Sequence, residues 1–274
     1  MNSCSSEALR LRSPKQRSPC RAAPVALPRR GDIFPSRVNT SLPKARTELD
    51  FAPCRSFSCA VVVFARAPIA GKAKTRLIPR LGLRGAAEFQ AVLISDTLRK
   101  LRSLRGALIP YLFSAGKHSS SFPTDRTCTV LRQRGADLGE RLSHAFRLLL
   151  RRHTAVVILG TDSPLLPARI LRQASQELRS CEAVLGPCPD GGYYLIGLRH
   201  FPSGMLTGVR WGTAYAFRDT LRRLRHHNLC CSILPPVADV DRPRDLLQLQ
   251  GKLRENGAAR RLAPATWRFL RDLR

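Results

Sequence analysis

The chain has 274 residues, which is enough for one large domain or two small ones with a substantial hydrophobic core. Hydrophobic residues make up 43% of it, which excludes a chain that is disordered throughout, and its apolar runs are too short to span a bilayer. The formal net charge is +28, but the basic residues are spread along the chain and aromatic residues are only 6%, too few for a base-stacking surface. This dispersed pattern favours surfaces that are Arg-rich in general over a patch that binds nucleic acid. A basic surface also helps to attract phosphate-bearing substrates.

Residues 1–57 differ in composition from the rest. They contain 11 Lys or Arg against 4 Asp or Glu, many Ser and Pro, and no sustained hydrophobic period. This composition predicts a disordered basic N-terminal extension. It has no continuous apolar core of a secretory signal; its Arg- and Ser-rich, acid-poor character is like that of an organellar transit peptide, and a plain tail is the alternative.

The nine cysteines include no C-x-x-C pair and no zinc-like spacing with histidine. A chain of this size does not need disulfides for stability, so we expect free thiols in a reducing compartment. A cytoplasmic location follows as the prediction, and Cys230-Cys231 is interpreted as part of a buried strand.

From residue 58 onwards, short apolar and β-branched runs alternate with segments of helical period. Strands are expected at 58–64, 107–113, 128–131, 155–159, 182–186, 193–198 and 229–234. Helices are expected at 83–104, 137–152, 167–180, 213–227 and 243–253. The alternation predicts an α/β domain over residues 58–250, with a three-layer, mostly parallel twisted sheet and helices on both faces. Residues 251–274 form a C-terminal tail or a short helix.

The start of the second helix carries a specific signal. Asp137 and Glu140 match a capping box, in which the side chain of each residue accepts a hydrogen bond from the backbone N–H of the other. Leu138, Leu142 and Leu149 then recur on one face, which we expect to be buried.

Ligands of such sheets bind beyond the carboxyl ends of the strands, so the loops there are informative. The first, residues 64–77, contains four cations and a glycine that lets the backbone approach a ligand closely. It matches neither the P-loop nor the dinucleotide-binding glycine pattern. An ordinary basic surface loop is the alternative. We predict that it binds the phosphates of a donor through Arg66, Gly71, Lys74, Thr75 and Arg76.

Two further loops carry carboxylates that suit Mg²⁺ or Mn²⁺. Asp162 follows the apolar strand at 155–159 and is a candidate metal ligand, although it or Ser163 also suits a helix cap. Asp239 and Asp241 follow the last strand, and either one can supply a second carboxylate or cap the next helix. Asp241 is taken as the second metal ligand.

The segment Asp190-Gly191-Gly192 allows two interpretations. Two glycines beside a carboxylate suit a close approach to a substrate, but Asp-Gly is also a strong hairpin-turn signal. Local chemistry alone favours the turn.

Six segments in a fixed order, between about residues 60 and 250, resemble one known family. They are Phe64-Ala-Arg-Ala-Pro-x-x-Gly-x-x-Lys-Thr-Arg-Leu77, Gln133-x-Gly-Ala-Asp-Leu-Gly-Glu-Arg141, Gly160-Thr-Asp-Ser-Pro164, Gly186-Pro-x-x-Asp-Gly-Gly-Tyr-Tyr-Leu-Ile-Gly-Leu198, Trp211-Gly-Thr213 and Asp239-Val-Asp-x-Pro-x-Asp-Leu246. The pattern resembles the bacterial DUF2064 family, within the GT-A-type nucleotide-diphosphosugar transferase superfamily. Members are often described as arsenosugar-biosynthesis glycosyltransferases. The N-terminal extension and the tail lie outside the resemblance.

The resemblance implies a sheet-based transferase that uses a divalent metal, Mg²⁺ or Mn²⁺. By carry-over, Lys74 and Arg76 contact donor phosphates, Asp162 binds the metal, and Asp162 and Asp190 are the catalytic residues. Only this resemblance favours the interpretation of the Asp-Gly-Gly segment as part of the site over its interpretation as a plain turn. The implied acceptor side is made of Gly191, Gly192, Tyr193 and Trp211.

Three functions are consistent with these features. The first is a metal-dependent glycosyltransferase with a nucleotide-sugar donor and a small-molecule acceptor. The second is a nucleotidyltransferase acting on a small phosphorylated acceptor. Asp162-Ser-Pro164 supplies one carboxylate where GT-A enzymes have Asp-x-Asp, and the Lys-Thr-Arg-Leu run resembles the lactate-phosphate guanylyltransferases of coenzyme F420 synthesis. The third is an inactive, basic nucleic-acid-binding protein that has kept the fold.

Overall fold

The computed structural model describes residues 56–116 and 128–273, so nearly all of the predicted N-terminal extension lies outside the described residues. The described part contains one seven-stranded sheet in the order β3-β2-β1-β4-β6-β5-β7. β6 runs antiparallel to both neighbours, and the other pairs are parallel. The strands are β1 (Cys59–Arg66), β2 (Ile109–Ala115), β3 (Thr129–Arg132), β4 (Ala155–Leu159), β5 (Ala183–Pro187), β6 (Tyr193–Leu198) and β7 (Cys231–Ile233).

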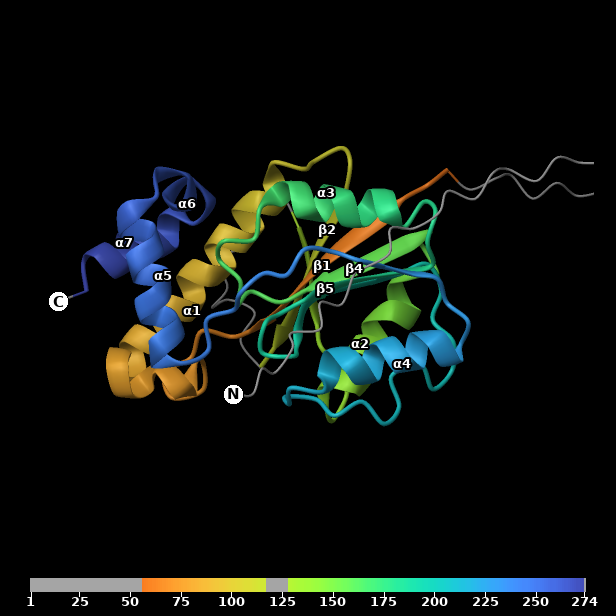
Figure 1. The fold of residues 1–274 in the computed structure, drawn as a ribbon, viewed down its shortest axis with the longest axis horizontal. Coiled ribbons are helices and arrows are strands. Elements are labelled where there is room, and N and C mark those ends of the chain that lie inside the picture. Colours follow the sequence, from red (N-terminus) through yellow and green to blue (C-terminus); the bar gives the residue numbers. More distant parts are fainter. Residues whose placement is uncertain (1–55, 117–127, 274) are drawn as a thin grey trace, which may run out of the picture. The chain divides into compact units, whose positions relative to one another are not determined.

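Helices cover both faces of this sheet, as Figure 1 shows. They are the 3₁₀ turn η1 (Thr75–Leu77) and the helices α1 (Ile78–Arg102), α2 (Leu138–Leu149), α3 (Ala168–Glu177), α4 (Ala216–His226), α5 (Pro243–Glu255), α6 (Gly257–Leu262) and α7 (Pro264–Arg271). The predicted α/β class, with a mostly parallel sheet between two helical layers, is confirmed. None of the described helices is long and apolar enough to cross a membrane.

The central strands are apolar throughout because both of their faces are buried. Along β1, Val61 and Val63 pack with α1 and α3, whereas Ala60 and Val62 pack with α2 and α4. This alternation follows from the two-residue period of a strand. It explains why a continuous apolar run predicted this strand.

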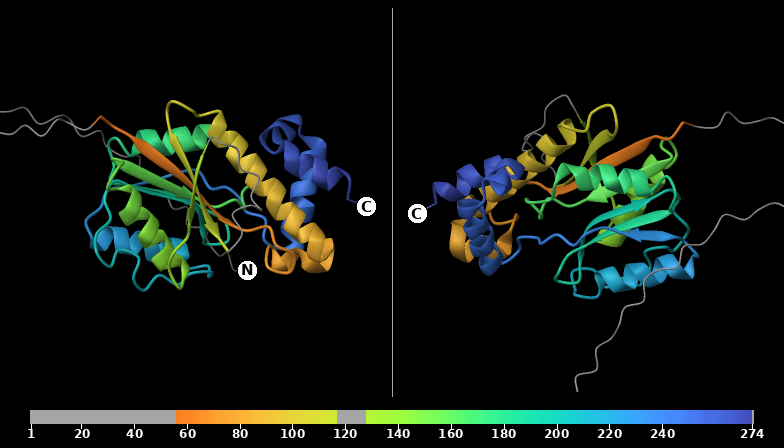
Figure 2. Two further views of the ribbon diagram at one scale, coloured as in Figure 1. Left: turned by 180° about the vertical axis from the view of Figure 1, so that it is seen from behind. Right: turned by 45° about the horizontal axis from the view of Figure 1, so that its top comes forward.

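A third hydrophobic cluster lies away from the sheet. Phe89 and Leu93 of α1 pack against Leu246 and Leu253 of α5 and Leu270 of α7. Figure 2 shows these C-terminal helices (blue) beside α1 (gold) from both directions. The segment 251–274, expected as a tail or a short helix, thus contains the end of α5 and the two helices α6 and α7, which pack on α1 and α5.

Several expected boundaries differ from the structure. α1 begins five residues earlier than predicted, because Gly82 with φ 69° joins a short first segment to the main helix. The strand expected at 229–234 is only Cys231–Ile233, and Cys230 is exposed. The interpretation of Cys230-Cys231 as part of a buried strand is wrong. Cys230 precedes β7, and Cys231 is only partly buried because β7 is an outer strand that pairs with β5 alone among the described strands.

The α2 cap is also shifted from the predicted box. Asp137 Oδ1 accepts from the Glu140 N–H at 2.8 Å, as expected, but the Glu140 carboxylate accepts from the Ala136 N–H, one residue earlier. Leu138 is exposed, so the predicted buried face begins at Leu142.

Candidate active site

The loops that follow β1 and β4 and the segment that follows β7 meet at the carboxyl edge of the sheet. The Val240 N–H donates to the Asp162 carbonyl oxygen at 2.8 Å, which joins the segment after β7 to the loop after β4. The Asp245 carboxylate accepts from the backbone N–H groups of Asp241 and Arg242, at 3.2 and 2.8 Å. These contacts hold Asp241 beside Asp162.

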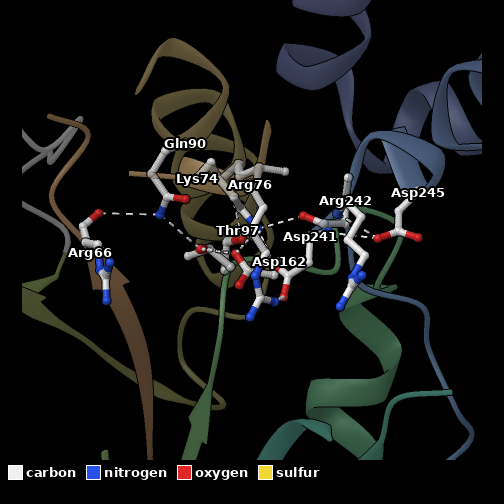
Figure 3. A network of polar contacts seen from close by, with 12 residues as sticks. Arg66, Lys74, Arg76, Gln90, Thr97, Asp162, Asp241, Arg242 and Asp245 are labelled. Atoms are coloured by element: carbon white, nitrogen blue, oxygen red, sulfur yellow. Dashed lines mark hydrogen bonds and ion pairs between the residues drawn. The ribbon is translucent and has the colours of Figure 1, made fainter. Parts of the chain in front are cut away.

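Lys74 lies between the two carboxylates, as Figure 3 shows. Its Nζ lies 2.9 Å from Asp162 Oδ1 and 2.9 Å from Asp241 Oδ1, and it donates to the Val240 carbonyl oxygen at 2.7 Å. Burial alone would lower the pKa of Lys74, but the two carboxylates outweigh it and raise the pKa above its ordinary value. Lys74 is therefore charged and paired inside the protein.

A cavity of about 370 Å³ opens beside this group. Arg76 lies at its rim, with its guanidinium 3.7 Å from Asp241 Oδ2, and Arg66 donates to the Lys72 carbonyl oxygen. The predicted loop residues Arg66, Lys74, Thr75 and Arg76 all line the cavity, together with Asp162 and Asp241. Gly71 does not line it; with φ +75°, it turns the loop.

Gln90 is a site residue that sequence reasoning missed. Although it lies on α1, its side chain is buried and its amide donates to Thr161 Oγ1 at 3.3 Å and to the Arg66 carbonyl oxygen at 3.4 Å. It thereby joins the ends of β1 and β4 at the cavity wall. The available signal was a polar residue on the apolar face of a predicted helix.

Lys100 supports the same loop from behind. Its buried Nζ donates to the Pro164 carbonyl oxygen at 2.6 Å, two residues after Asp162. Burial lowers the pKa of Lys100 to about 8, against the opposing effect of Asp96. The sequence carries no signal of this role, because Lys100 lies in a predicted helix among arginines and looks like an ordinary surface cation.

A second cavity, of about 630 Å³, shares Arg76 and Asp241 with the first. Its wall includes Asp190, Thr213 and Asp239. Burial, with the nearby charges of Asp190 and Asp241, raises the pKa of Asp239 to about 6. The two predicted segments that carry Asp190 and Asp241 thus meet in the wall of this second cavity.

Asp190, Asp239 and Cys188 offer ligand atoms within 4.8 Å of one another, so they form a further group that could hold a metal ion. Burial and the neighbouring carboxylates raise the pKa of the Cys188 thiol. A protonated thiol is a poor ligand, and hard ions such as Mg²⁺ prefer oxygen. The carboxylates are therefore the relevant part of this group.

The Asp-Gly-Gly segment forms a tight turn between β5 and β6. Asp190 Oδ1 accepts from the Gly192 N–H at 2.9 Å, and the Cys188 N–H donates to the Gly192 carbonyl oxygen at 3.0 Å. Gly191 has φ +88°, and a Cβ atom there would collide with the backbone of Ala214. Gly191 thus permits a close approach of the turn to the backbone of Ala214, and the turn presents Asp190 to the second cavity.

Tyr193 and Trp211 lie elsewhere. Their rings meet edge to face with centroids 6.2 Å apart, in the cluster that includes α2 and α4. Trp211 lines a separate cavity of about 700 Å³ beside the start of α2. The next residues, Gly212 and Thr213, line the Asp190 cavity instead.

Comparisons with known proteins agree with the fold. A model of the family described as "Uncharacterized protein conserved in bacteria (DUF2064)" matches residues 99–213. A structure from Desulfovibrio desulfuricans G20, provisionally described as a nucleotide-diphospho-sugar transferase, is 30% identical with a TM-score of 0.71; the match covers 79% of this chain and 95% of that one.

A more distant structure shares the fold alone. It is the 4-diphosphocytidyl-2C-methyl-D-erythritol synthase of Anaerococcus prevotii DSM 20548, at 9% identity and a TM-score of 0.50, with 72% of this chain and 96% of that chain covered. No curated protein matches the chain.

Proposed function

Because this chain belongs to the DUF2064 family of nucleotide-diphospho-sugar transferase-like proteins, we propose that it is a metal-dependent glycosyltransferase with a nucleotide-sugar donor and a small-molecule acceptor. One observation carries the proposal: Asp162 and Asp241, from separate strand ends, face a cavity that is also lined by Arg66, Thr75 and Arg76. Carboxylates and guanidinium groups side by side suit a metal-bound diphosphate.

Asp162 and Asp241 would hold the ion. Both supply oxygen ligands, both already contact one cation at 2.9 Å, and their side chains are 44% and 37% exposed, so an ion can reach them. This donor set fits Mg²⁺ or Mn²⁺. When bound, the ion would stabilise the charge that develops on the departing nucleoside diphosphate.

Arg66, Thr75 and Arg76 would contact the donor phosphates, with Lys74 next to them. Arg76 is 62% exposed at the cavity rim, so its guanidinium can turn from Asp241 towards a phosphate. Gly71 would contribute indirectly, through the course of the loop. Fixed cations of this kind stabilise the diphosphate leaving group in the transition state.

The acceptor would occupy the second cavity. Asp190 lines this cavity, where its carboxylate can accept the proton of an acceptor hydroxyl as the hydroxyl attacks the sugar carbon. The turn at Gly191 and Gly192 would set the position of Asp190. The shared wall of Arg76 and Asp241 would bring donor and acceptor together.

Nucleotidyl transfer is the second candidate. It is favoured by the separate origin of the two carboxylates, one after β4 and one after β7, in place of an Asp-x-Asp pair in one loop. In that reaction, a phosphorylated acceptor attacks the α-phosphate of a nucleoside triphosphate and pyrophosphate leaves.

A thermal-shift panel separates the two candidates. The full chain is heated with nucleotide-sugars or nucleoside triphosphates, each with and without Mn²⁺. A ligand at 100 times its Kd stabilises the folded state by about 2.7 kcal/mol, which raises the midpoint by about 5–11 °C. We expect a Mn²⁺-dependent rise with one nucleotide-sugar, and loss of the Mn²⁺ dependence in Asp162→Asn.

A rise with nucleoside triphosphates alone would favour nucleotidyl transfer. If no ligand raises the unfolding midpoint, both candidates are contradicted.

A further inference from the structure

The Lys74 ammonium has three N–H donors and three acceptors. These acceptors are Asp162 Oδ1, Asp241 Oδ1 and the Val240 carbonyl oxygen, all within 2.9 Å. The Lys74 side chain is only 6% exposed. A donor phosphate therefore cannot gain a hydrogen bond from Lys74 until one of these three contacts is broken.

The loop backbone is shaped to direct Lys74 inwards. Lys74 adopts a left-handed conformation with φ 44° and ψ 44°, immediately before η1. Among the described residues, Asn228 is the other non-glycine residue with a positive φ. This conformation is unfavourable for a side chain with a Cβ atom, so the surrounding contacts must maintain it.

The charges around Lys74 explain what maintains its left-handed conformation. Asp162 and Asp241 bring two negative charges to one point, and without a cation between them they would repel. Lys74 supplies a positive charge there that belongs to the chain itself. Arg76 lies farther out, at 3.7 Å from Asp241 Oδ2, and is largely exposed.

We propose that Lys74 is an internal cation that holds Asp162 and Asp241 together in the free enzyme and competes with the divalent metal for them. This inference rests on the proposed metal-dependent transferase. Lys74 Nζ must leave at least one carboxylate for the ion to bind there, and its released N–H group is then available to a donor phosphate.

One consequence is coupling between metal and donor. In the free enzyme, the metal must displace an ammonium that has no other partner nearby in the described structure, apart from the Val240 carbonyl oxygen. With a diphosphate present, the displaced ammonium gains a phosphate oxygen. Each ligand should therefore tighten the binding of the other, by the same factor in both directions.

The test compares Mn²⁺ binding by calorimetry in the wild type, Lys74→Met and Lys72→Met, in the full chain without nucleotide. Lys72 is an exposed lysine in the same loop, so Lys72→Met removes the same charge without removing a contact to either carboxylate. We expect Lys74→Met to bind Mn²⁺ at least tenfold more tightly than the wild type, and Lys72→Met to match the wild type. Equal or weaker binding by Lys74→Met would overturn the inference.

Inorganic pyrophosphate provides the second measurement. It should tighten Mn²⁺ binding by a larger factor in the wild type than in Lys74→Met, and an equal factor in both would contradict the coupling. Should Lys74→Met fail to fold, Lys74→Gln, which retains polar contacts without charge, takes its place. Both measurements read metal affinity and not turnover. Equal Mn²⁺ affinities with normal nucleotide-sugar binding would thus remove this inference alone, whereas the expected affinities without nucleotide-sugar binding would remove the glycosyltransferase.

Discussion

At the scale of residues, four carboxylates share the carboxyl edge of the sheet in different surroundings. Asp162 and Asp241 share the Lys74 ammonium, whereas Asp190 accepts a backbone N–H. Asp239 is partly buried beside Asp190 and Asp241, which together with burial raises its pKa to about 6. Its ionised form is therefore the one that the folded protein disfavours.

The Asp239→Asn variant tests this view. Because the pKa of Asp239 is about 6 in the folded protein against 3.8 unfolded, its contribution is fully favourable below pH 3.8 and is lost as pH rises through 6. We expect the variant to exceed the wild type in unfolding free energy by about 1 kcal/mol at pH 7, after allowance for solvent screening, and to lose this advantage near pH 4.

Urea unfolding from pH 4 to 7, in the presence of a chelator, measures this difference. Asp272→Asn is the control, because Asp272 is an exposed carboxylate near the C-terminus that lines neither cavity of the site. A stability difference that does not change with pH would show that Asp239 does not titrate in this range.

Some residues of the site were predictable and others were not. The carboxyl ends of parallel strands meet at one edge, so the segments of Arg66, Asp162 and Asp241 had to approach each other. The inward direction of Lys74 depends on a left-handed backbone that its sequence does not signal. Tyr193 packs with the α2 and α4 cluster and not at the site. Successive side chains of a strand point to opposite faces of the sheet, so a residue can follow the Asp-Gly-Gly turn and still face away from the cavity.

At the scale of elements, α7 depends on a residue of α1 for its N-terminal cap. Its own N-cap residue, Ala263, has no side-chain acceptor. Asp96 takes that place: its two carboxylate oxygens accept from the N–H groups of Ala265 and Thr266 at 3.0 and 2.9 Å. Asp96 is almost fully buried, so these contacts are shielded from water.

Asp96→Ala should lower the unfolding free energy by at least about 2 kcal/mol, because it removes two charge-assisted hydrogen bonds and leaves buried N–H groups without acceptors. Asp96→Asn, which keeps one acceptor oxygen, should lose less. The midpoint of urea denaturation gives both values. A loss below about 0.5 kcal/mol in Asp96→Ala would contradict the capping role.

Strongly patterned elements were predictable from sequence, and those that depend on long-range partners were not. The strands β4 and β6 have the predicted boundaries. The antiparallel direction of β6 follows from the short turn at 188–192, for which the hairpin-turn signal at Asp190-Gly191 was present in the sequence. α6 and α7 were missed as packed helices because their apolar side chains are buried against α1 and α5, which are distant partners that the local pattern does not reveal.

At the scale of the whole molecule, the formal charge of +28 acts on any anionic donor. Long-range attraction raises association rates and is screened by salt. We expect the association rate constant of a fluorescent nucleotide-sugar analogue to fall by about tenfold between 50 and 500 mM salt. Stopped-flow fluorescence measures it, and a rate constant that does not depend on salt would show that the charge has no role in donor capture.

The outermost strands of the described sheet, β3 and β7, have four and three residues. β7 is soon followed by Pro235 and Pro236, which lack the backbone N–H that a neighbouring strand would need. Such short outer strands give little template for edge-to-edge pairing between molecules. At its two ends the described sheet therefore offers little backbone for β-type aggregation, and this holds even at high salt, where the positive charge no longer keeps copies apart.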